Sequence, residues 1–88
     1  MSDEANLVDV EINGVHYTLK GDTSPENIFK LSRHVDEQIK LVIRRNPRLS
    51  LYKAAILVAL NITEELFVLR EEYDSLMQLL EPESKSNK

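Results

Sequence analysis

Residues 50–81 read SLYKAAILVALNITEELFVLREEYDSLMQLLE and contain neither Gly nor Pro. The pattern predicts a single helix of about 30 residues, about 45 Å long at 1.5 Å of rise per residue. Ser50 is a good N-cap for this helix, and Pro82 ends it. The remainder of an 88-residue chain is too small to cover a helix of this length. The sequence therefore predicts that part of the cover comes from another copy of the chain.

The apolar residues of this helix change their arrangement along its length. Between Ala54 and Ile62 they lie on every side except at Asn61, and a helix that is apolar all round has to be surrounded. Beyond Thr63 they form a stripe, which favours pairing with another helix. The predicted dimer core consists of Ala55, Leu57, Val58, Leu60 and Ile62. The predicted coiled-coil seam consists of Leu66, Leu69, Tyr73, Leu76 and Leu80.

Ala55, Val58 and Ile62 continue the seam toward the N-terminus, and the eight residues from Ala55 to Leu80 have a mean spacing of 25/7, about 3.57, with one irregular step between Ile62 and Leu66. This value lies between the 3.5 residues of a heptad and the 3.6 of a straight helix. This spacing indicates a weakly supercoiled seam. The alternative is an amphipathic helix that packs within its own chain, but only a hairpin and one further helix are available to cover it. Asn61 has two interpretations, a buried amide that sets the register or a side chain that bonds to backbone at the rim, and both stay open.

A β-hairpin is predicted at the N-terminus. Apolar and polar residues alternate over 8–12 and again over 15–19, and Asn13-Gly14 lies between the two runs. Asn-Gly favours a type I′ turn, because that turn needs positive φ at both central residues. A two-residue loop places Ile12 opposite Val15, with the other apolar pairs on the same face. An isolated hairpin is marginally stable, so this one has to pack on helices, and strands of another subunit are a further option.

A first helix is predicted over about residues 24–46. Ser24 can act as the N-cap with Pro25 at the first helical position, and Thr23 with Glu26 forms a competing capping box one residue earlier. Asn46-Pro47 ends the helix. We therefore expect a disordered leader over 1–6, a head over 7–49 with its hairpin at 7–20, the long helix over 50–81, and a disordered tail over 82–88. The predicted fold class is α+β, a dimeric head with a projecting coiled coil.

Composition argues against several classes of function. The chain has no Cys, and its two His residues, His16 and His34, lie on different predicted elements. Neither Gly belongs to a phosphate-binding loop, and no Ser has a matched base and acid. We expect no enzymatic activity, no metal site and no cofactor. The N-terminus does not resemble a signal peptide, and no apolar run reaches the roughly 20 residues that cross a bilayer, so we expect a cytoplasmic protein without membrane insertion.

A local block of positive charge stands out in a chain of net charge −4. No Asp or Glu occurs from Gln38 to Thr63, and this window includes Arg44, Arg45, Arg48 and Lys53. The negative end of the first helix accounts for Arg44 and Arg45, and solubility accounts for part of the rest. Lys53 lies near the positive end of the next helix, where neither explanation applies. The block is therefore a candidate docking patch for an acidic partner.

Four stretches resemble the ZapA family of bacterial Z-ring-associated cell-division proteins. They are VDVEINGVHYTLKGD at 8–22, SPE at 24–26, NPRLS at 46–50 and, above all, AAILVALNITEEL at 54–66. The resemblance covers about residues 7–80, and the short coil is similar to that of Gram-positive members. The alanine-rich run followed by ALNI and an acidic pair is the most specific of these motifs.

The resemblance implies a head that dimerises and a coil that pairs dimers into antiparallel tetramers. It also implies that the head binds FtsZ, the tubulin-like division protein, and cross-links its protofilaments at the mid-cell division site without catalysis. The region of FtsZ contact in the family includes the block of Arg44, Arg45, Arg48 and Lys53. Two alternatives remain, a coiled-coil adaptor for another acidic partner and a nucleic-acid-binding dimer. The acidic net charge and the lack of aromatic residues among the basic ones disfavour nucleic acid.

Overall fold

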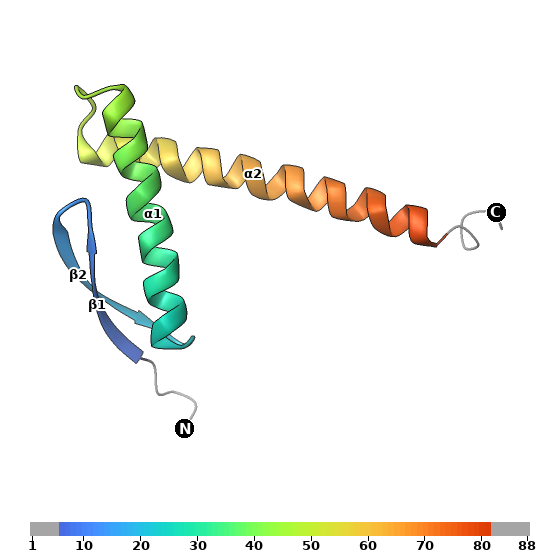
Figure 1. Cartoon of the computed structure of the whole chain (residues 1–88), viewed down its shortest axis with the longest axis horizontal. Coiled ribbons are helices and arrows are strands. Elements are labelled where there is room, and N and C mark those ends of the chain that lie inside the picture. The colour runs from blue at the N-terminus through green and yellow to red at the C-terminus, as the bar shows by residue number, and fades with distance from the viewer. Residues whose placement is uncertain (1–5, 82–88) are drawn as a thin grey trace. The chain divides into compact units, whose positions relative to one another are not determined.

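The structure is a computed structural model that describes residues 6–81, so the predictions for residues 1–5 and 82–88 lie outside the described part. Two strands precede two helices (Figure 1): β1 (Asn6–Ile12), β2 (Val15–Gly21), α1 (Pro25–Arg45) and α2 (Leu51–Leu80). This order confirms the predicted α+β fold. The chain divides into two compact units, residues 1–58 and residues 59–88, and α2 contributes its first two turns to the first unit.

The hairpin forms with the predicted register. β1 and β2 pair antiparallel, with Ile12 opposite Val15 and Val10 opposite Tyr17. Asn13 and Gly14 have φ values of 50° and 79°, as a type I′ turn requires. On the face that carries Asp9, the Thr18 hydroxyl donates a hydrogen bond of 2.7 Å to the Asp9 carboxylate. The pairing therefore places six apolar residues on the opposite face, Val8, Val10, Ile12, Val15, Tyr17 and Leu19, whereas Leu7 shares the face of Asp9 and is exposed.

α1 begins and ends at the residues that the sequence predicts. The Ser24 hydroxyl accepts a hydrogen bond from the Asn27 N–H at 3.1 Å, and Pro25 is the first helical residue. Thr23 also contributes, because its hydroxyl accepts from the Asn27 side-chain amide at 3.0 Å. At the other end, the Asn46 N–H donates to the Val42 carbonyl at 3.0 Å and caps the helix. Ser24 is therefore the cap, while Thr23 supports the same turn through a side chain.

A small apolar core joins α1 to the first strand. Val8, Val10 and Ile28 are buried together, with Ile12 packed against them. Gly21 allows the end of β2 to approach this core, since a Cβ at Gly21 would lie 3.2 Å from Ile28 Cδ1. The apolar residues of β2 are less well covered: Val15, Tyr17 and Leu19 keep 36–41% of their surface exposed. Within the hairpin, burial is therefore concentrated on β1, and the other buried apolar residues, Ile39, Ala54 and Val58, lie on the helices.

The tip of the hairpin is attached to α1 by a charged side chain. The Asn13 N–H donates a hydrogen bond of 2.7 Å to Asp36 Oδ1, and Lys40 Nζ lies 3.1 Å from Asp36 Oδ2. The hydrogen bond from the Asn13 backbone, followed by the contact with Lys40, lowers the pKa of Asp36 below its usual value. The Asp36 carboxylate thus attaches the hairpin turn to the middle of α1.

α2 is a single helix from Leu51 to Leu80. Ser50 caps it as predicted, because its hydroxyl accepts from the Lys53 N–H at 3.1 Å. Ala54 and Val58, one turn apart, are the buried residues of the described part of this helix. The first two turns of α2 therefore bury one narrow face.

Replacing Ile28 with Ala tests the core under β1. We expect the free energy of unfolding to fall by about 2–4 kcal/mol, because a buried side chain is lost from a small core and leaves a cavity. Lys30→Ala, at an exposed position on the same helix, is the control and should change the stability little. Urea denaturation at one fixed protein concentration measures both variants. Equal stabilities would contradict this description of the core.

Asp36→Asn tests the attachment of the hairpin tip. Because the pKa of Asp36 is lowered in the folded protein, its stabilising effect is complete above the unfolded pKa and is lost as the pH falls through the folded pKa. The urea midpoint of the wild type should therefore fall once the pH drops toward the unfolded pKa of about 3.9, and it should continue to fall as the pH passes through the lower folded pKa. In Asp36→Asn the midpoint should be lower at pH 7, and its decrease toward pH 3 should be smaller. An identical pH profile for the two proteins would show that this contact does not contribute to stability.

Candidate partner-binding surfaces

The predicted basic residues come together at the connection between α1 and α2. Arg44 and Arg45 form the last turn of α1, Arg48 lies in the connection, and Lys53 lies in the first turn of α2. Asn46 organises the connection: its side-chain oxygen accepts from the Arg48 N–H at 3.3 Å, and its carbonyl accepts from the Leu49 N–H at 3.0 Å. A backbone held by local hydrogen bonds therefore carries all four positive charges.

These four residues form what we call the basic turn: Arg44, Arg45, Arg48 and Lys53. All four side chains are exposed. Within residues 6–81, none of the four forms an ion pair with a carboxylate, and the Lys40–Asp36 pair accounts for the other lysine of the acid-free window. The positive charge of the basic turn is therefore available to an acidic surface.

The predicted dimer core is only partly covered by its own chain. Val58 is buried beside Ala54, which has no exposed surface, and Ile62 is half-buried. The other predicted core residues, Ala55, Leu57 and Leu60, are exposed. One side of this apolar block thus packs inside the first unit, and its other sides are exposed to solvent in the single chain.

All five residues of the predicted seam are exposed: Leu66, Leu69, Tyr73, Leu76 and Leu80 retain 41–64% of their surface. Leu69 and Tyr73, with Arg70 and Asp74 beside them, line a shallow hollow of about 410 Å³. Asn61 is exposed as well, so its two interpretations remain open. An exposed row of large apolar residues along a helix marks a surface for association.

The acidic and imidazole side chains of the head do not form a cluster in the part of the chain that the structure describes. Among residues 6–81, no group of three or more His, Asp or Glu side chains is placed to hold a metal ion. His16 lies on β2, 3.9 Å from Glu11, whereas His34 lies on α1. No helix in the described range is both long and apolar enough to cross a membrane.

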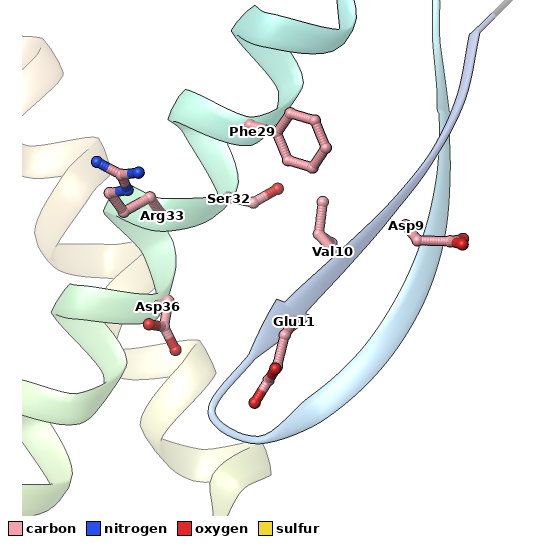
Figure 2. Close-up of a pocket in the computed structure, with 7 residues that line it drawn as sticks. All are labelled: Asp9, Val10, Glu11, Phe29, Ser32, Arg33 and Asp36. Carbon is pink, nitrogen blue, oxygen red and sulfur yellow. The ribbon is translucent and has the colours of Figure 1, made fainter.

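One feature of the head was not predicted from the sequence. A groove of about 320 Å³ lies between β1 and α1, lined by the seven residues drawn in Figure 2: Asp9, Val10, Glu11, Phe29, Ser32, Arg33 and Asp36. The helical spacing of four lining residues could have predicted that they share one face of α1: Phe29, Ser32, Arg33 and Asp36. The sequence could not show that residues 9–11 of β1 form the other side of the groove, because this depends on how α1 packs on β1.

Comparison with known proteins gives consistent matches over nearly the whole chain. The sequence model of the family described as "Cell division protein ZapA" matches residues 8–87. The Cell division protein ZapA of Geobacillus thermodenitrificans (strain NG80-2) is 40% identical over 84 residues, covering 94% of this chain and 92% of the relative. That of Geobacillus sp. (strain WCH70) is 38% identical over 76 residues, covering 86% and 87%.

A solved structure supports the same conclusion. The structure described as "ZapA mutant dimer from Geobacillus stearothermophilus" is similar to this chain with a TM-score of 0.69 and 33% identity. The match covers 91% of this chain and 94% of the other. Both the sequence and the fold therefore agree with the resemblance carried by AAILVALNITEEL at 54–66. The chain belongs to the ZapA family of cell division proteins.

Proposed function

We propose that this protein forms a dimer, binds FtsZ through the basic turn, and cross-links FtsZ protofilaments at the mid-cell division site. The observation that carries the proposal is the row of exposed apolar residues on α2, which a single chain leaves uncovered. Family membership supplies the context, and the similar Geobacillus stearothermophilus structure is described as a dimer. The activity is one of binding and assembly in the cytoplasm, without a chemical step.

The physical mechanism follows from symmetry. A single chain with one basic turn decorates a filament, whereas a twofold dimer presents two basic turns and an antiparallel tetramer presents four. Once one turn has bound, the next binding event is effectively intramolecular, so weak contacts add up to firm cross-linking. The exposed charges of the basic turn speed association with an acidic filament and make binding sensitive to salt.

The two apolar parts of α2 have different roles in this scheme. The block at 54–62 forms the core of the dimer, since its exposed residues surround a face that the head already covers. The seam from Leu66 to Leu80 pairs dimers into a tetramer. Acidic residues such as Glu71, Glu72 and Asp74 flank this apolar stripe and repel the same residues of the partner helix, so this second association is the weaker one.

Leu69→Glu, or Leu76→Glu, tests the seam. Each change places a charge in an apolar contact between helices, and we expect FtsZ bundling measured by light scattering to fall at least fivefold. The head should stay folded, because both residues are exposed in the single chain. Val68→Glu is the matched control, since Val68 is also exposed and lies off the seam. Unchanged bundling by both seam variants, or a monomeric wild type in sedimentation at micromolar concentration, would rule out the scheme.

Changing Arg44, Arg45 and Arg48 together to Glu tests the basic turn. Co-pelleting with FtsZ filaments should fall at least tenfold at 50 mM salt, because the change reverses three exposed charges. The circular dichroism spectrum should be unchanged. The control carries the same change of net charge at three other exposed positions of the first unit, Lys20, Lys30 and Arg33. If the two triple variants lose binding equally, the contact is not localised to the basic turn.

A further inference from the structure

The outer edge of β1 is unpaired in the described chain. β1 pairs with β2 alone, and the pair of Ile12 and Val15 closes the turn. The residues that flank a two-residue turn exchange hydrogen bonds, and the pattern then alternates along the ladder. The N–H and C=O groups of Leu7, Asp9 and Glu11 therefore point away from β2. A row of such groups is a template for another strand.

α1 forms a wall beside this edge. Phe29, Ser32, Arg33 and Asp36 lie on one face of the helix, and with residues 9–11 they enclose the groove of about 320 Å³. In Figure 2 the Phe29 and Ser32 side chains are turned toward Val10, whereas the Arg33 guanidinium points away from β1. An open strand edge beside a groove is where an extended peptide can add as a further strand.

The charges of the groove select the type of peptide. Asp9 and Glu11 are exposed, and both lie on the face of the hairpin opposite the apolar core. Asp36 contributes less to the groove, because Lys40 contacts its carboxylate at 3.1 Å. In Figure 2 the Asp9 side chain points away from α1, and its carboxylate accepts the hydrogen bond from Thr18 on β2, while Glu11 lies 3.9 Å from His16. With the Arg33 guanidinium directed away as well, these two carboxylates still leave the edge strand with a net negative charge. A positively charged segment is therefore complementary to it.

The register of a third strand predicts the order of its side chains. Residues placed opposite Asp9 and Glu11 share their face, so Lys or Arg at those positions forms favourable cross-strand pairs. The residue between them lies on the face toward α1 and meets Phe29, because Ser32 is buried and its hydroxyl donates to the Ile28 carbonyl. An apolar side chain suits that position because Phe29 is half exposed. Basic and apolar residues should therefore alternate.

A second copy of β1 is a poor occupant of this edge. Antiparallel pairing of two β1 strands would bring Asp9 and Glu11 of one chain close to the same acidic residues of the other, and like charges across strands are destabilising. Charged residues on an edge strand also discourage accidental pairing. Asp9 and Glu11 could therefore serve only to prevent accidental strand pairing, or they could select a basic peptide, and the two roles give different results in a binding experiment.

We propose that the groove between β1 and α1 binds an extended peptide segment with basic residues at alternate positions, which adds to the free edge of β1 as a third strand. The site is separate from the basic turn in sequence and opposite in charge. The head would then recognise a second, basic partner while the basic turn engages an acidic one. The inference depends on the hairpin and α1 and not on FtsZ binding.

The probe is a fluorescein-labelled peptide, acetyl-Lys-Val-Lys-Val-Lys-Val-Lys-amide, and binding to the full-length protein is measured by fluorescence anisotropy at 50 mM salt. Two further peptides carry N-methyl groups, one on every Lys amide and the other on every Val amide. A strand that pairs along one edge uses the amides of alternate residues only. We therefore expect one methylated peptide to bind like the parent and the other to bind at least tenfold more weakly.

Protein variants test the groove from the other side. Asp9→Asn combined with Glu11→Gln should weaken binding of the parent peptide about tenfold, because two favourable cross-strand pairs are lost. Asp22→Asn combined with Glu26→Gln removes the same two charges at exposed positions outside the groove and should leave the affinity unchanged. Circular dichroism confirms that both double variants are folded.

Four results would overturn the proposal. Failure of the parent peptide to bind would show that the edge charges are only protective. Equal binding of the two methylated peptides, or equal loss in the two double variants, would show attraction by charge without strand pairing. If the peptide lowers the sedimentation coefficient by separating subunits, the edge is occupied by a second copy of the chain.

Discussion

The whole structure depends on the mismatch between one long helix and the small chain that carries it. α2 continues for 30 residues, and within residues 6–81 only Ala54 and Val58 of this helix are buried. Large apolar side chains from Leu57 to Leu80 remain in contact with water. Covering apolar surface releases about 25 cal/mol per Å², so association is the main way for this protein to gain stability. The proposed function, which is based on assembly, is consistent with that constraint.

The head solves a different problem, which is to hold a two-stranded hairpin that would be marginal alone. It does so from one side: α1 covers β1 through Ile28, and the Asp36 carboxylate accepts the N–H of the turn. β2 takes little part in this packing and keeps its apolar residues partly exposed. The head is therefore stabilised asymmetrically, with an apolar core at the middle of β1 and a polar contact at the tip.

The sequence predicted the local structure well because its signals are local. Asn13-Gly14, Ser24-Pro25, Asn46-Pro47 and Ser50 each determine a turn or a cap through their own backbone preferences, and all four occur as expected. Contacts between elements were less accessible. The hydrogen bond from Asn13 to Asp36 joins residues 23 positions apart, and no pattern along the chain indicates it. The basic turn was visible as an acid-free window, whereas the groove required the packing of α1 on β1.

The connection at Asn46 affects the entropy of the binding that we propose for the basic turn. A loop that orders only when a partner arrives loses backbone freedom at that moment, and this loss weakens the complex. Here the Asn46 side chain and carbonyl already hold residues 48 and 49, and helices fix the backbone on both sides. Only the long Arg and Lys side chains still have freedom to lose. Most of the backbone entropy of this surface is thus lost during folding, before any partner is present.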